Sequence, residues 1–112
     1  MSVTIYHNPR CSKSRTTLAL LQNNNADPVI VEYLNTPPSV EELKNIISLL
    51  GIAPRELLRA KDAREAGVDA SLDDDALIAA MVANPIVIER PIVVAGGKAK
   101  IGRPPEDVLD IL

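Results

Sequence analysis

A short strand, a helix and a second short strand follow one another within the first 33 residues, and this order constrains the fold most strongly. Val3–Tyr6 and Val29–Tyr33 are runs of residues that favour β-structure. Between them, Lys13–Asn24 carries Leu18 and Leu21 on one helical face. A helix that links two strands in this way is a right-handed crossover between parallel strands. The sequence therefore predicts a βαβ unit at the start of the chain.

A β-hairpin and a final helix are predicted near the C-terminal end of the sequence. Ile92–Ala95 and Lys98–Ile101 have the composition of strands, and Gly96-Gly97 between them suits a tight turn because glycine readily adopts positive φ. Pro104-Pro105 can open a helix, since proline is favoured at the first helical position. We expect the buried side of this helix to consist of Val108, Leu109 and Leu112.

The middle of the sequence predicts helices without strands. Ser39–Glu42 matches a capping box, in which the Ser hydroxyl and the Glu carboxylate each accept a hydrogen bond from a backbone N–H. We expect a further helix to open at Pro54 and another to be capped by residues 71–74. Residues 61–70 are predicted to hold one short helical turn and a loop. Residues 85–90 are predicted to be an extended linker, because a proline disfavours helix in the residue before it.

Together these elements predict an α/β protein with a mixed four-stranded sheet and helices on its faces. The order β-α-β followed by β-β-α is a thioredoxin-like layout, in which residues 39–83 form a helical insertion. We predict one domain over residues 1–112, because the helical block is small and closely joined to the rest. Hydrophobic residues make up 46% of the chain, but Phe and Trp are absent, so the core must be mainly aliphatic.

The composition also limits the functional classes. A net charge of −3 argues against general affinity for nucleic acid. A single cysteine cannot form an internal disulfide, which fits a reducing cytoplasm. One Cys and one His are too few for a closed zinc site, and the sequence shows neither a signal-peptide pattern nor an apolar run of membrane-spanning length. We therefore expect a cytoplasmic protein that binds no metal, cofactor, membrane or nucleic acid.

The loop between the first strand and the first helix contains the single cysteine, Cys11, among basic side chains. A sulfur at a helix N-terminus faces backbone N–H groups and the positive end of the helix dipole, which favour the thiolate. We predict that Cys11 is a nucleophile; the alternative is a small buried residue of the core. For His7 the alternatives are a hydrogen bond to a loop carbonyl and stabilisation of the thiolate. For Ser14 they are helix capping and a hydrogen bond to the sulfur.

Three arginines outside this loop are candidates for binding an oxyanion, because the guanidinium fork matches a tetrahedral anion with two parallel hydrogen bonds. Arg90 and Arg103 flank the predicted hairpin and should lie at the same end of the sheet. Arg59 is predicted to end the helix that opens at Pro54, where a cation also interacts favourably with the helix dipole. The Arg90-Pro91 peptide bond can be cis or trans, and the sequence does not decide between them.

In these motifs and their order, the sequence resembles the ArsC-type arsenate reductases, which are coupled to glutathione and glutaredoxin. The similarity is greatest to a short subgroup of that family that lacks a C-terminal extension. It extends over nearly the entire chain. The segments that carry it are residues 5–9 with Cys11, Ser14-Arg15, Tyr33-Leu34, Pro37–Ser39, Arg55–Arg59, Arg90–Val94, Arg103-Pro104 and Val108–Leu112.

The resemblance implies that Cys11 is the nucleophile of a monothiol arsenate reductase and that His7 and Ser14 tune its thiolate. It implies that the oxyanion is held by Arg59, Arg90 and Arg103. In that family arsenate forms an adduct on the cysteine, glutathione attacks it, glutaredoxin removes the glutathione as a mixed disulfide, and arsenite leaves. The expected partners are therefore arsenate or a similar oxyanion, glutathione and glutaredoxin, and we expect a monomer.

Two other functions stay open from the sequence. Proteins of the Spx type, which are also thioredoxin-like, bind RNA polymerase and regulate transcription, but they typically use a Cys-x-x-Cys pair. Here Ser14 stands at the second position, so an internal disulfide switch is excluded. A glutathione-dependent thiol-disulfide oxidoreductase with another substrate would use the same reactive Cys11, but it would need a groove for a peptide or for glutathione.

Overall fold

The computed structural model describes residues 2–112 of the chain. The chain divides into two compact units, one formed by residues 2–36 and Arg90–Leu112 and the other by Pro37–Glu89. The second unit contains the predicted helical insertion, residues 39–83, and extends beyond it at both ends. The single domain over residues 1–112 stays a prediction. No helix within residues 2–112 is long and apolar enough to cross a membrane.

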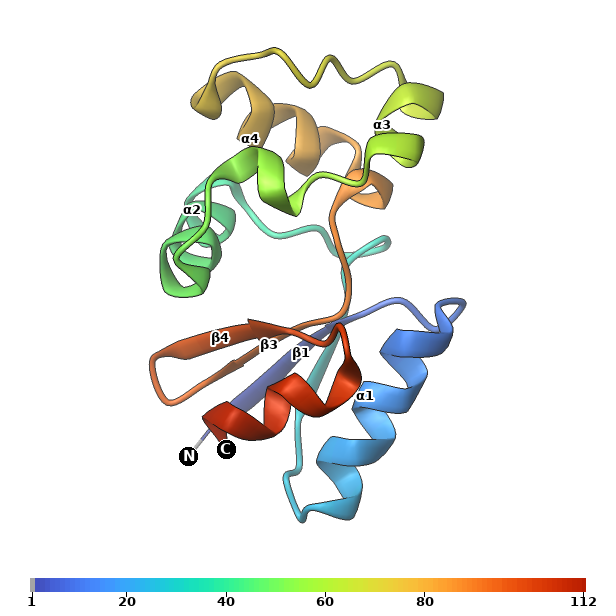
Figure 1. Cartoon of the computed structure of the whole chain (residues 1–112), viewed down its shortest axis with the longest axis vertical. Helices are drawn as coiled ribbons and strands as arrows, with labels where there is room; N and C mark the ends of the chain where they lie inside the picture. Colours follow the sequence, from blue (N-terminus) through green and yellow to red (C-terminus); the bar gives the residue numbers. More distant parts are fainter. Residues whose placement is uncertain (1) are drawn as a thin grey trace. The chain divides into compact units, whose positions relative to one another are not determined.

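The first unit contains a mixed four-stranded sheet (Figure 1). Its strands are β1 (Val3–His7), β2 (Val29–Glu32), β3 (Ile92–Ala95) and β4 (Lys98–Ile101), and their order across the sheet is β2-β1-β3-β4. β1 is parallel to β2 and antiparallel to β3, and β3 is antiparallel to β4. The helix α1 (Ser12–Asn23) connects the two parallel strands, so the predicted βαβ unit is confirmed.

The hairpin and the core of the first unit also follow from the sequence. Gly96 and Gly97 have φ angles of 56° and 75°, as the predicted two-residue turn requires. α1 and a C-terminal 3₁₀ helix, Pro105–Ile111, pack on the sheet and on each other (Figure 1). The buried cluster is aliphatic and includes Val3, Ile5, Leu21, Val93, Ala95, Val108 and Ile111.

The C-terminal helix buries different residues from those predicted. Val108 is buried as expected, but Leu109 and Leu112 are 36% and 40% exposed, and Ile111 is buried instead. The reason is the type of helix, because a 3₁₀ helix has about three residues per turn and aligns residues i and i+3. Val108 and Ile111 therefore share the buried face, while Leu109 and Leu112 share an exposed one.

The second unit is helical. It contains α2 (Val40–Leu50), α3 (Ala60–Ala66), α4 (Asp74–Ala83) and short 3₁₀ helices at Pro54–Leu57 and Pro85–Val87. The prediction for residues 61–70 was wrong in extent, since α3 continues until Gly67 ends it with a left-handed backbone conformation. The prediction of an extended linker at residues 85–90 was also wrong. Pro85 begins a helical turn there, because the first position of a helix does not need the N–H that proline lacks.

The capping box at the start of α2 is formed as predicted. Ser39 Oγ accepts a hydrogen bond from the Glu42 N–H at 3.1 Å, and the Glu42 carboxylate accepts one from the Ser39 N–H at 3.2 Å. Ser39→Ala should lower the free energy of unfolding by about 1 kcal/mol, because one N–H of the first turn loses its partner. Urea denaturation followed by circular dichroism measures this change. The matched control is Ser48→Ala, at an exposed position of the same helix, and an equal loss in both variants would contradict the prediction.

Candidate active site

Cys11 lies at the junction of β1 and α1, at the position that caps the helix N-terminus. Its backbone N–H donates to the carbonyl of Asn8 at 3.0 Å, which closes a tight turn between the strand and the helix. The Cys11 backbone is extended, with φ −92° and ψ 123°, so the chain enters the helix directly after it. Its side chain is partly buried. The structure thus places the thiol where the sequence predicted it, at the start of the first helix.

Guanidinium and backbone amide groups surround the Cys11 sulfur. Arg103 Nη2 donates to Sγ at 3.6 Å, and the Arg90 side chain forms a second hydrogen bond with it. The backbone N–H groups of Ser14 and Lys13, in the first turn of α1, also favour the thiolate. Burial raises the pKa of the Cys11 thiol, but these hydrogen bonds and the charge of Arg103 outweigh burial and hold the pKa below its ordinary value. More of the sulfur is therefore thiolate at neutral pH than in a free cysteine.

Arg90 and Arg103 are held together at one end of the sheet, as predicted. Arg103 Nε donates to the backbone carbonyl of Arg90 at 2.9 Å. Ile92 and Ile101, at the adjoining ends of β3 and β4, are paired in the sheet, which brings the two arginines into register. The peptide bond between Arg90 and Pro91 is cis, which answers the question that the sequence left open.

The partner of the His7 side chain is Ser14. His7 Nδ1 and Ser14 Oγ are 2.6 Å apart, the Asn8 N–H donates to the same hydroxyl at 3.0 Å, and both side chains are buried. Burial lowers the pKa of His7; the negative charge of Glu32 opposes this effect, and the positive charge of Arg15 adds to it. His7 is therefore neutral at neutral pH. It fixes the turn in which the Ser14 backbone N–H faces the sulfur, so its effect on the thiolate is indirect.

The structure places Arg59 in the second unit, at the start of a helix rather than at the end of one. The 3₁₀ helix that opens at Pro54 ends at Leu57, and Leu58 is extended and paired with Ile88. Arg59 therefore immediately precedes α3, and the predicted interaction with a helix C-terminus was wrong. Because the Leu58 backbone pairs with Ile88, the 3₁₀ helix stops after one turn and does not include Arg59.

Two carboxylates hold the Arg59 side chain within the second unit. Its Nε donates to Asp62 at 2.6 Å, and its Nη1 donates to Glu89 at 2.7 Å. Burial lowers the pKa of Arg59, but the two carboxylates outweigh burial and raise the pKa above its ordinary value. The other candidate residues are brought together in the first unit, around the sulfur.

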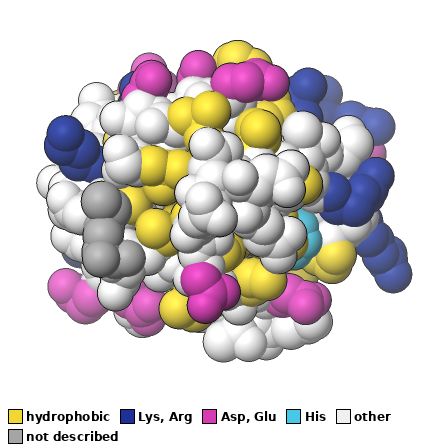
Figure 2. All heavy atoms as spheres, turned by 90° about the horizontal axis from the view of Figure 1, so that it is seen from below, with side chains coloured by type: hydrophobic (Ala, Val, Ile, Leu, Met, Phe, Trp, Pro, Cys, Tyr) yellow, Lys and Arg dark blue, Asp and Glu magenta, His cyan; other side chains and the backbone are white. Residues whose placement is uncertain are grey.

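The loop that contains the thiol is locally basic although the whole chain has a net charge of −3. Arg10, Lys13 and Arg15 are exposed beside Cys11, and Arg15 Nη1 donates to the Pro9 carbonyl at 3.0 Å. Figure 2 shows Lys and Arg side chains gathered on the side where the histidine is visible. This local charge attracts an anionic reactant to the sulfur.

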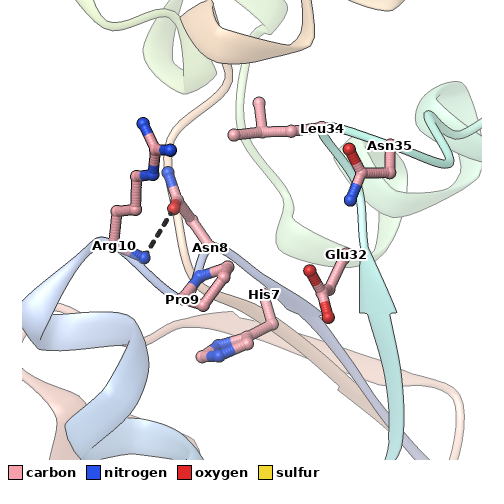
Figure 3. A pocket seen from close by; sticks show the side chains of 7 residues that line it. All are labelled: His7, Asn8, Pro9, Arg10, Glu32, Leu34 and Asn35. Carbon is pink, nitrogen blue, oxygen red and sulfur yellow. Dashed lines mark hydrogen bonds between the residues drawn. The ribbon is translucent and has the colours of Figure 1, made fainter.

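A cavity of about 290 Å³ lies at the carboxyl ends of β1 and β2 (Figure 3). Its lining consists of His7, Asn8, Pro9, Arg10, Glu32, Leu34 and Asn35. Glu32 and Asn35 were not predicted to belong to a site. The signal that could have identified them is topological, because parallel strands end at the same edge of a sheet and the loops after them meet there. Within residues 2–112, no group of three or more His, Cys, Asp and Glu side chains is placed to hold a metal ion.

Comparison with known proteins agrees with the resemblance in the sequence. The model of the ArsC family matches residues 6–111. The chain belongs to the ArsC family. A protein of Haemophilus influenzae named arsenate reductase is 50% identical over 116 residues, and the match covers 100% of both chains. An uncharacterized Escherichia coli protein, YfgD, is 54% identical, and the match covers 98% of this chain and 96% of that protein.

The solved structure of an arsenate reductase from Vibrio cholerae has the same fold as this ArsC-family chain. The two superpose with a TM-score of 0.94 at 55% sequence identity, covering 100% of this chain and 98% of the other. The thioredoxin-like α/β fold with a mixed four-stranded sheet, predicted from the sequence, is therefore confirmed.

Arg103→Met should raise the pKa of the Cys11 thiol, because the sulfur loses a hydrogen bond and a nearby positive charge. A higher pKa leaves less thiolate at any pH near or below it, so alkylation by iodoacetamide should also become slower. The chain has one cysteine and two tyrosines, so the pH-dependent ultraviolet absorbance that remains after subtraction of the same titration in Cys11→Ser reports the Cys11 thiolate. The control is Lys98→Met, which removes a charge at the other end of β4. An equal pKa shift in both variants would contradict a specific role for Arg103.

Proposed function

We propose that the protein is a monothiol arsenate reductase, which reduces arsenate to arsenite with Cys11 as the nucleophile. The observation that carries the proposal is the Cys11 sulfur at the N-terminus of α1, with Arg103 at 3.6 Å and Arg90 as a second donor. A thiolate beside two guanidinium groups suits an electrophile that is a tetrahedral oxyanion. The relatives named arsenate reductase, at 50% and 55% identity, support arsenate as that oxyanion.

The arginines have an electrostatic task in this proposal. Arsenate and thiolate are both anions, so they repel each other unless nearby positive charge compensates. Arg90 and Arg103 already contact the sulfur and can each direct a further N–H toward arsenate oxygens. Arg59 is proposed as a third oxyanion ligand on the family resemblance alone, since Asp62 and Glu89 hold its guanidinium in the second unit.

The first step joins arsenic to the protein. The Cys11 thiolate attacks the arsenic of dihydrogen arsenate, an As–S bond forms, and one As–O bond breaks. The departing oxygen takes up one proton from solution and leaves as water. No electrons have been transferred at this point, so arsenic in the adduct is still arsenic(V).

The reduction needs two thiols from outside the chain, because Cys11 has no second cysteine with which to form a disulfide. Glutathione replaces another oxygen of the adduct, which leaves as water. A glutaredoxin thiolate then attacks the glutathione sulfur, an S–S bond forms, and the electron pair of the broken As–S bond stays on arsenic, which becomes arsenic(III). Water displaces Cys11 and releases arsenite. The sum is one arsenate and two thiols giving one arsenite, one disulfide and one water.

Glutathione acts as a co-substrate and supplies the electrons, so we propose that no cofactor is bound. We propose that the protein works in the cytoplasm, since the cytoplasm keeps both thiols reduced. We also propose that it is a monomer.

The test is the oxidation of NADPH in an assay that couples arsenate, glutathione, glutaredoxin and glutathione reductase. We expect turnover that requires arsenate and both thiols. No arsenate turnover would overturn the proposal. In that case, reduction of a model glutathione mixed disulfide would favour the thiol-disulfide oxidoreductase, and association with RNA polymerase in a pull-down would favour the Spx-type regulator.

A further inference from the structure

The cavity at the ends of β1 and β2 offers charged groups that the chemistry of arsenate on Cys11 does not use. Arg10 and Glu32 are exposed charged residues of its lining, and Asn35 is an exposed amide. Within residues 2–112, none of these three side chains forms a hydrogen bond or an ion pair. Figure 3 shows Arg10 with Asn8 on one side of the cavity and Glu32 with Asn35 on the other. A ligand there meets a cation on one side and a carboxylate on the other.

The turn before Cys11 fixes the cationic side of the cavity. Asn8 is only 3% exposed, and its Oδ1 accepts a hydrogen bond from the Arg10 N–H at 2.9 Å. This bond determines the orientation of the Asn8 amide and leaves its NH₂ group as a donor beside the Arg10 side chain (Figure 3). A buried, oriented donor next to a guanidinium is a preorganised site for a carboxylate.

The cavity and the arginine pair lie on opposite sides of β1. In the sheet order β2-β1-β3-β4, Glu32 and Asn35 lie at the end of β2, whereas Arg90 precedes β3 and Arg103 follows β4. Cys11 follows the end of β1, between these two groups. A second reactant held in the cavity would therefore reach the sulfur from the side opposite Arg90 and Arg103.

We propose that this cavity binds the γ-glutamyl end of glutathione, an inference that rests on glutathione as the co-substrate of the proposed function. That end carries both an α-ammonium and an α-carboxylate. Glu32 and the Asn35 carbonyl oxygen accept from the ammonium, and Arg10 and the Asn8 NH₂ donate to the carboxylate. The glycine end carries only a carboxylate, which Glu32 would repel. The volume of about 290 Å³ is at the low end for small-molecule sites, which suits one end of the tripeptide.

The experiment measures binding of S-methylglutathione, whose blocked thiol cannot react with Cys11 or with arsenic. Calorimetry or amide NMR shifts give the dissociation constant for the wild type and for Glu32→Gln, Arg10→Met and Asn35→Leu. We expect each charge-removing variant to weaken binding by about tenfold, because a charge-assisted hydrogen bond is lost. Asn35→Leu changes no charge near His7, so weaker binding of the probe by this variant cannot arise from a changed charge on His7. The matched controls are Glu106→Gln and Lys98→Met, at exposed positions away from β2.

Two truncated probes identify which end of glutathione is bound. S-methylated γ-glutamylcysteine should bind like S-methylglutathione and respond to the same variants. S-methylated N-acetylcysteinylglycine, in which the acetyl group prevents the free ammonium that cysteinylglycine would carry, should bind more weakly to the wild type and show no loss of binding in Glu32→Gln. Equal binding of the two truncated probes, or no change in Glu32→Gln and Arg10→Met, would overturn the inference.

These outcomes separate the inference from the proposed function, because binding of the methylated probes requires neither arsenate nor glutaredoxin. A protein that binds the probes as expected but does not reduce arsenate would refute the proposed function alone. A protein that reduces arsenate with an unchanged KM for glutathione in Glu32→Gln would refute the inference alone.

Discussion

Cys11→Ser should reduce arsenate turnover to the background of the coupled assay while leaving the fold intact. A serine hydroxyl is not ionised near neutral pH and is a far weaker nucleophile than a thiolate, so the adduct with arsenic cannot form at a useful rate. Serine is also a favoured residue at a helix N-cap, the position that Cys11 occupies. The free energy of unfolding should therefore change by no more than about 0.5 kcal/mol. NADPH oxidation and urea denaturation measure the two effects.

Chemical modification of the wild type is an independent control for the role of Cys11. Because the chain has one cysteine, iodoacetamide can alkylate only this sulfur, and the alkylated protein should be as inactive as Cys11→Ser. Ser48→Ala, at an exposed position of α2, should keep full turnover. Turnover above background in Cys11→Ser or in the alkylated protein would contradict the role of Cys11 as the nucleophile. A matching loss of turnover in Ser48→Ala would show that the effect is not specific to Cys11.

The parts of the fold that the sequence predicts well are those specified by neighbouring residues. The hairpin turn depends on two glycines that tolerate positive φ, and the capping box of α2 depends on two side chains three positions apart. The place of Cys11 depends on a strand that ends and a helix that begins within a few residues. In each case the decisive interactions join residues close together in the sequence, so the local sequence pattern is enough to predict them.

Two of the errors, at Arg59 and Leu109, arose where contacts between distant segments determine the conformation. Arg59 follows an extended residue because Leu58 pairs with Ile88, thirty positions away in sequence, and no local pattern shows this pairing. The exposure of Leu109 depends on whether the last helix is α or 3₁₀, which its packing against α1 and β4 influences. The partner of His7 is likewise set by the turn of the chain, which returns Ser14 to the end of β1.

Gly102, the residue before Arg103, is the most tightly packed of the glycines whose surroundings are described. A Cβ at this position would lie 2.6 Å from Thr17 Oγ1, 3.2 Å from Thr17 Cγ2 and 2.8 Å from Pro91 Cγ. Neither neighbour can move easily. The Thr17 side chain is fully buried and donates to the Lys13 carbonyl at 2.7 Å, and the Pro91 ring is rigid. Gly102 also donates its N–H to the Pro91 carbonyl at 2.9 Å, so it links the segments beside β3 and β4 while it packs against Thr17 of α1.

Gly102→Ala should lower the free energy of unfolding by about 1–3 kcal/mol, because the added methyl group overpacks this contact. It should also slow alkylation of Cys11, since Arg103 is the next residue and its guanidinium contacts the sulfur. Urea denaturation and iodoacetamide kinetics measure both effects. In a Thr17→Ala background, which removes two of the three close contacts, the same change should cost less than it does in the wild type. An equal loss in both backgrounds would show that the contact with Thr17 is not what excludes a side chain at position 102.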